Sequence, residues 1–196
     1  GVNANLEGTP DSMDKYVEHL QRDKRFKMAH LKWTEGDGNS FPRLSIKVRE
    51  GLVGHKFPDH VSPLKRTGKY VQPHELKKMY EEGKDDFIIL DMRNDYEVNV
   101  GHFDKTLDLD LKASRDLAKP EVLDKIRVHG KDKKLITICT GGVKCEKMSS
   151  YLLDQGFENV HQLHGGIQTY MKMYPGQDVK GALFTYDDRK VIHFGG

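Results

Sequence analysis

The stretch that decides the fold is Leu135 to Met148, which reads LITICTGGVKCEKM. It begins with four residues of strand character, passes through Cys139 and a Gly-Gly pair, and runs into a helical pattern that Gly156 ends. A strand that leads through a tight loop into a helix directs the loop's backbone N–H groups toward one point, with the positive end of the helix behind them. We therefore predict an anion cradle in this loop.

Cys139 is the nucleophile that this loop predicts. It occupies the first position of the cradle, where backbone donors stabilise a thiolate and lower a cysteine pKa from its ordinary ~8.5. Gly141 and Gly142 remove side chains that would block a ligand, and Lys144 adds positive charge. The alternative interpretation is a small buried hydrophobic side chain. Cys145, at the far end of the loop, is either a resolving thiol or a packed residue of the first helical turn, and the spacing does not decide between them.

From Lys69 onward, segments of strand character alternate with segments of helical character. This alternation predicts an α/β unit with a largely parallel sheet. The predicted strands are 87–91, 106–109, 135–138 and 159–163, and the predicted helices are 73–83, 114–117, 121–128 and the one after Gly142. Leu183 to Phe194 is predicted to form a hairpin that turns at Asp187 and Asp188.

Three charged residues follow the predicted strand that ends at Asp91. Arg93 comes two residues later and Glu97 four beyond that, which favours a buried ion-pair network at the edge of the sheet. We interpret this network as a brace for the active-site loop rather than as catalytic machinery. We expect no metal, because the histidines and the two cysteines lack the spacing of a zinc site.

The first fifty residues read as a small α+β unit. Thr9 and Pro10 predict the start of a helix. Residues 30–33 and 41–48 alternate like two strands around a turn at 36–39. The glycine- and proline-rich stretch 51–68 is expected to be a solvated linker.

Bulk composition indicates a globular chain. Of its 196 residues 36% are hydrophobic and 32% charged, and no apolar run approaches the ~20 residues that span a bilayer. Two cysteines do not form a secreted disulfide framework, so we expect a reducing cytoplasm and no membrane. Residues 1–70 carry 13 Lys/Arg against 9 Asp/Glu, which suits phosphate contact and an ordinary solvated surface equally. Nothing in the composition indicates an oligomeric state.

The loop resembles the active-site loop of rhodanese (sulfurtransferase) domains, whose cysteine carries a persulfide. More narrowly, CTGGVKCEK at 139–147 resembles CTGGIRCEK of the oxygen-dependent tRNA uridine hydroxylases, with Lys144 in place of an arginine. Further stretches of this chain match the family in the same order: 1–4, 41–50, DMRNDYE at 91–97, GHF at 101–103, HGGI at 164–167 and FTYDDR at 184–189.

This resemblance implies a rhodanese-like parallel sheet flanked by helices and preceded by a partial ferredoxin-like α+β domain. The implied boundaries are a partial ferredoxin-like domain at 1–50, the linker at 51–68, a rhodanese domain at 69–175 and a C-terminal hairpin extension at 176–196. Because the family has another strand and helix upstream, we expect the chain to be truncated within its N-terminal domain.

The resemblance also implies an activity: hydroxylation of the wobble uridine of tRNA to 5-hydroxyuridine. Cys139 would be catalytic, and the tRNA anticodon region would be the partner. Molecular oxygen would be the co-substrate, and no cofactor is evident. The active-site loop comprises Thr140, Gly141, Gly142, Val143, Lys144 and Cys145.

Two other classes of function compete. One is a sulfurtransferase that carries sulfane sulfur as a persulfide on Cys139, and the other is a binding module with an inert thiol. A cysteine phosphatase is excluded, because its loop has the pattern C-x5-R and the sixth residue after Cys139 is Cys145.

Overall fold

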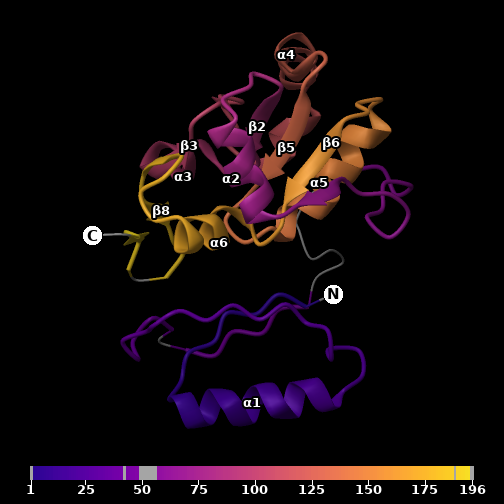
Figure 1. Cartoon of the computed structure of the whole chain (residues 1–196). Helices are drawn as coiled ribbons and strands as arrows, with labels where there is room; N and C mark the ends of the chain where they lie inside the picture. Colours follow the sequence, from indigo (N-terminus) through magenta and orange to yellow (C-terminus); the bar gives the residue numbers. More distant parts are fainter. Residues whose placement is uncertain (1, 42, 49–56, 188, 195–196) are drawn as a thin grey trace. The chain divides into compact units, whose positions relative to one another are not determined.

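The computed structural model describes residues 2–41, 43–48, 57–187 and 189–194. The chain forms two compact units, one of residues 1–50 with 185–190 and the other of residues 51–184 with 191–196 (Figure 1). Each unit is described by itself below.

The larger unit is built on a five-stranded sheet. Its order is β1-β6-β5-β2-β4, and every neighbouring pair is parallel. The strands are β1 (Lys69–Val71), β2 (Phe87–Asp91), β4 (Thr106–Leu107), β5 (Lys134–Ile138) and β6 (Val160–Leu163). A sheet of parallel strands joined by helices confirms the predicted α/β class.

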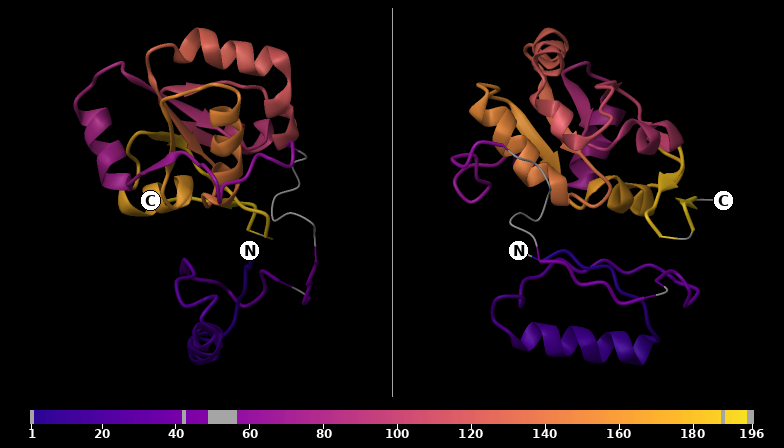
Figure 2. Two further views of the ribbon diagram at one scale, coloured as in Figure 1. Left: turned by 90° about the vertical axis from the view of Figure 1, so that its right-hand side faces the viewer. Right: turned by 180° about the vertical axis from the view of Figure 1, so that it is seen from behind.

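Helices cover both faces of this sheet (Figures 1 and 2). One face packs on α4 (Pro120–Gly130), α5 (Val143–Asp154) and the short 3-10 helix η1 (Ser114–Ala118). The other face packs on α2 (Pro73–Glu81) and α6 (Gly166–Met173).

The position of β2 in the sheet explains why its sequence is continuously apolar from Phe87 to Leu90 rather than alternating. Ile88 and Leu90 belong to the core on the α4–α5 face, whereas Phe87 and Ile89 belong to the core on the α2–α6 face. All five β2 residues are buried, as expected for a central strand covered on both sides.

Several short elements lacked a predictive pattern. These are β1, the helix α3 (Asp95–Val100), α6, and the antiparallel pair β3 (Gly101–Phe103) and β7 (Val179–Gly181). Strands of three residues are too short to show periodicity, so their pairing is set by the neighbouring strand. The predicted C-terminal hairpin is confirmed: β8 (Leu183–Phe184) pairs antiparallel with β9 (Val191–Ile192). Of its predicted turn, Asp188 lies outside the described residues.

In the smaller unit the helix prediction is confirmed and the strand prediction is wrong. Helix α1 (Pro10–Arg22) begins after Thr9, whose Oγ1 accepts the N–H of Ser12. Within the described residues, 30–33 and 41–48 contain no strand. The apolar positions that suggested a strand are exposed, at 82% for Leu44, 82% for Ile46 and 98% for Val48. Alternation stabilises a strand only when one face is buried, whereas these three side chains are exposed.

The expected solvated linker is also corrected in part. Residues 51–56 of it lie outside the described residues. From residue 57 onward the chain packs on the larger unit: the Phe57 ring stacks on Tyr151 of α5 at 4.1 Å between centroids, and Val61 is buried in the same core. His60 Nε2 lies 3.0 Å from Asp154 Oδ1. Phe57 and Val61 are apolar residues that could have indicated burial, but the glycines and prolines of the segment favoured the prediction of a linker.

Candidate active site

Cys139 directly follows the last residue of β5, at the carboxyl edge of the sheet. Open α/β sheets place their sites at this edge. The loop ends where α5 begins at Val143, and the residue before that helix, Gly142, has φ of +88°. This left-handed conformation favours glycine. It lets the chain turn sharply enough to set the N-terminal end of α5 behind the thiol.

The sulfur of Cys139 accepts backbone hydrogen bonds from the loop. The N–H of Gly142 donates to Sγ over 3.1 Å, and the N–H of Lys144 donates to it as well. Both donors belong to the start of α5, so the helix dipole acts in the same direction as the hydrogen bonds. The loop therefore surrounds the thiol with the donors that the sequence predicted.

The loop's carbonyl groups point to a different element, the N-terminal end of α6. The N–H of Ile167 donates to the carbonyl of Cys139 over 3.0 Å, and that of Gln168 to the carbonyl of Thr140 over 3.1 Å. A Cβ atom on Gly166 would lie 2.4 Å from the Cys139 carbonyl, so no larger residue fits there. Because α6 satisfies these carbonyls, the N–H groups of the loop are left to face the thiol.

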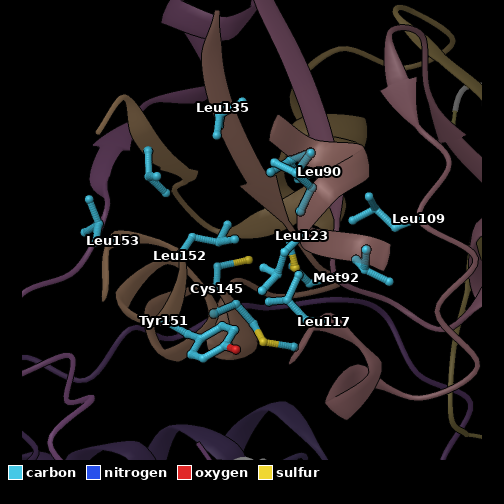
Figure 3. Close-up of a cluster of buried hydrophobic side chains, with 14 of the residues drawn as sticks. Leu90, Met92, Leu109, Leu117, Leu123, Leu135, Cys145, Tyr151, Leu152 and Leu153 are labelled. Atoms are coloured by element: carbon cyan, nitrogen blue, oxygen red, sulfur yellow. The ribbon is translucent and has the colours of Figure 1, made fainter. Parts of the chain in front are cut away.

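Cys145 lies in the first turn of α5 and is completely buried. Figure 3 shows it among the side chains of Leu152, Leu123 and Met92. Its thiol hydrogen-bonds the sulfur of Cys139, and no disulfide joins the two. The site thus brings Cys145, whose role the sequence spacing left open, next to the predicted nucleophile Cys139.

The two thiols have opposite acidities. The hydrogen bond from Cys145 lowers the pKa of Cys139 below its ordinary value, against the opposing effect of burial, and the two backbone N–H groups and the charge of Lys144 lower it further. Burial and the neighbouring sulfur raise the pKa of Cys145. The two shifts together favour a thiolate at Cys139 that accepts a hydrogen bond from the thiol of Cys145.

Glu97 contacts the loop from α3. Its fully buried carboxylate accepts the N–H of Asn94 over 3.0 Å and the hydroxyl of Thr140 over 3.4 Å. The ammonium of Lys144 lies 3.9 Å from the same carboxylate. These contacts join the start of α3 to both ends of the loop, which is a bracing geometry.

Asp91 and Arg93 form a separate buried pair. Arg93 Nη2 donates to Asp91 Oδ2 over 2.6 Å and to the carbonyl of Gly101 over 2.6 Å, while its backbone N–H donates to Asp91 Oδ1 over 3.0 Å. The pair fixes the turn after β2 to the start of β3. The three charged residues thus act as two contacts, Asp91 with Arg93 and Glu97 with the loop, rather than as one continuous network.

Two further features of the site escaped the sequence analysis. The phenol of Tyr70, on β1, donates to Glu146 Oε1 over 2.6 Å, and its ring meets the ring of His164 edge to face at 5.5 Å. The pair Gly165 and Gly166 packs directly against the backbone of the loop. A Gly-Gly pair one residue after the end of β6 was a usable signal, whereas an isolated tyrosine on a short strand was not. Within the described parts of the chain, no three His, Cys, Asp or Glu side chains are grouped to hold a metal ion. Nor is any helix there long and apolar enough to cross a membrane.

Two protein-family models match separate ranges of the chain. The family described as "Rhodanese-like domain" matches residues 72–173, and the family described as "UPF0176 acylphosphatase like domain" matches residues 1–52.

Curated relatives match nearly the whole chain. A protein of Cytophaga hutchinsonii named tRNA uridine(34) hydroxylase is 40% identical over 191 residues, covering 97% of this chain and 59% of that protein. A protein of Staphylococcus aureus with the same name is also 40% identical over 191 residues, covering 96% of this chain and 59% of its own length. The chain thus spans about three-fifths of these relatives. Among solved structures, a rhodanese-related protein from Thermoplasma volcanium is 20% identical, with a TM-score of 0.45 over 57% of this chain and 97% of that one.

Proposed function

This chain belongs to the rhodanese-like domain family, and we propose that it hydroxylates the wobble uridine, position 34, of tRNA to 5-hydroxyuridine. The observation that carries this proposal is the 40% identity over 191 residues to proteins named for that reaction. The activity is proposed for the whole protein, since these relatives extend beyond the matched region.

The site supports a cysteine-centred reaction. Two backbone N–H groups and the thiol of Cys145 lower the pKa of Cys139, which favours its thiolate form. We assign Cys139 the role of nucleophile, the loop Thr140–Cys145 the role of cradle, and Glu97 with the Asp91–Arg93 pair the role of bracing. The anticodon region of tRNA is the proposed partner and molecular oxygen the proposed co-substrate, without a resident cofactor. A cytoplasmic location accompanies this proposal, because tRNA is the substrate.

The loop geometry favours a second candidate, sulfur transfer. A thiolate surrounded by backbone donors is equally suited to carry sulfane sulfur as a persulfide, since the terminal sulfur of a persulfide is also anionic. In this alternative Cys139 would accept sulfur from a donor and pass it to an acceptor nucleophile.

One measurement separates the two candidates. Nucleosides from the tRNA of cells that lack the full-length protein are quantified by mass spectrometry, beside cells complemented with it. We expect 5-hydroxyuridine to fall and thiolated nucleosides to stay constant. A fall in thiolated nucleosides with constant 5-hydroxyuridine would establish sulfur transfer instead.

A further inference from the structure

Tyr70 is a large aromatic side chain held in a fixed position at the surface. It is the middle residue of the edge strand β1 and is 47% exposed. Its phenol donates to Glu146 Oε1 over 2.6 Å. Burial of the hydroxyl and the charge of Glu146 raise its pKa, so the phenol stays protonated and keeps this bond. The ring is thus oriented before any ligand arrives.

The contacts of Tyr70 place it beside the Cys139 loop. Glu146 directly follows Cys145 in the first turn of α5, the helix that the loop starts. His164, whose ring Tyr70 meets at 5.5 Å, precedes the two glycines that pack against the loop. Tyr70 is therefore tied to both segments that form the cradle, α5 on one side and the β6–α6 turn on the other.

A planar, weakly polar ligand suits such a ring. An exposed aromatic ring that is already oriented loses little side-chain entropy when a flat group stacks on it. Every nucleobase offers a π-face, and RNA-binding sites use aromatic rings to hold bases that have left the helical stack.

We propose that Tyr70 is the stacking platform for the unpaired pyrimidine base that enters the Cys139 loop. This inference rests on the proposed function for the identity of the RNA. It assigns Tyr70 to substrate binding, a role distinct from that of the residues that brace the loop.

The purely structural alternative is that the phenol serves only to tie β1 to α5. Two substitutions separate these roles. Tyr70→Phe keeps the ring and removes the hydrogen bond to Glu146, whereas Tyr70→Leu removes the ring. Phe157→Leu is the matched control, because Phe157 is a partly buried ring in the α5–β6 connection, at the opposite end of the strands from the loop.

The test is binding of the full chain to an anticodon stem-loop RNA, measured by fluorescence anisotropy at one fixed salt concentration. A second RNA carries an abasic residue in place of uridine 34. We expect Tyr70→Leu to weaken binding of the uridine RNA by about 5- to 150-fold, the range of one base–aromatic stack. Binding of the abasic RNA should not change. Phe157→Leu should bind the uridine RNA like the unmodified chain. Tyr70→Phe, which keeps the ring but loses the bond that orients it, should lose much less binding than Tyr70→Leu. Thermal melting confirms that each variant is folded.

Three results would overturn the proposal. The first is an equal loss for both RNAs in Tyr70→Leu, the second is no loss for either, and the third is a loss in Tyr70→Phe as large as in Tyr70→Leu. The outcome is distinguishable from failure of the proposed function. If Tyr70 discriminates the two RNAs while tRNA in cells keeps its 5-hydroxyuridine without the protein, the platform stands and the hydroxylase assignment falls.

Discussion

The two ends of the active-site loop carry the same side chain in opposite surroundings. At the end of β5, Cys139 faces the N–H groups of Gly142 and Lys144. Six residues later, Cys145 lies in the first turn of α5, completely buried, where burial and the sulfur of Cys139 raise its pKa. Both thiols are buried, so burial alone does not decide acidity: the direction of nearby donors does. The surroundings of Cys139 thus favour its ionised form, and those of Cys145 favour a thiol that donates a hydrogen bond to it.

Removing the first of these thiols should have the largest effect. Cys139→Ser replaces a thiolate by a hydroxyl that stays protonated at neutral pH, so the site loses its nucleophile while the loop keeps its shape. We expect loss of activity by at least about 10³-fold. The measurement is 5-hydroxyuridine in tRNA from cells complemented with this variant, with protein abundance checked by blotting. Substantial activity in a stably expressed variant would show that Cys139 is not the nucleophile.

The contrast between the two thiols predicts selective alkylation. The pKa of Cys139 is lowered and that of Cys145 is raised. Cys139 should therefore remain a thiolate at pH values below ~8.5, the ordinary pKa of a cysteine, and lose reactivity only when the pH falls through its own lower pKa. We expect Cys139 to react with iodoacetamide at least about 100-fold faster than Cys145 at neutral pH, a ratio that corresponds to two pKa units. Peptide mass spectrometry after timed labelling between about pH 5 and 9 gives both rates. Equal alkylation rates of Cys139 and Cys145 in the folded protein would contradict the difference in acidity between the two thiols.

Removing the second thiol tests how much Cys145 contributes to the acidity of Cys139. Cys145→Ala deletes the hydrogen bond that contributes most to the acidity of Cys139. A hydrogen bond to a charged group contributes about 1.5–3 kcal/mol, so the thiolate-to-thiol ratio of Cys139 should fall by about 10- to 150-fold. The pH at which alkylation of Cys139 is half-maximal should rise accordingly. Cys145→Ser, which restores a donor, is the control and should recover part of the shift. An unchanged pH profile in Cys145→Ala would mean that the backbone N–H groups act alone.

The smallest effect should come from Lys144. Its ammonium is the weakest of the influences that lower the pKa of Cys139, and it lies 3.9 Å from the buried carboxylate of Glu97, which offsets its charge. Lys144→Gln should raise the pKa of Cys139 and reduce the thiolate-to-thiol ratio by no more than about threefold, the scale of a partly exposed charge pair. Lys144→Arg keeps the charge and should leave the alkylation profile unchanged. A shift in Lys144→Gln as large as in Cys145→Ala would show that charge, not hydrogen bonding, sets the acidity.

The fold of the larger unit could be predicted from the sequence because its strands are continuously apolar and its helices have clear starts. β2 is buried along its whole length and β5 from Leu135 onward, and four apolar residues in β2 and three in β5 indicate this directly. The failures have a common physical cause. Residues 41–48 alternate like a strand yet expose Leu44 and Val48, whereas Phe57, in a stretch that reads as linker, is buried against Tyr151. The local sequence pattern indicates which residues could be buried, but tertiary packing determines which residues are buried.

By itself, the sequence determined that a strand, a Gly-Gly loop and a helix would surround Cys139, since those elements are contiguous and their geometry is local. The tertiary structure alone decided the rest of the site. The α6 helix, which satisfies the loop's carbonyls, begins more than twenty residues after Gly142, and Glu97 contacts Thr140 across more than forty residues. The opposite acidities of Cys139 and Cys145 likewise depend on which way the loop folds against the core. Such contacts arise when parallel strands bring their carboxyl ends to one edge, an arrangement that sequence spacing does not record.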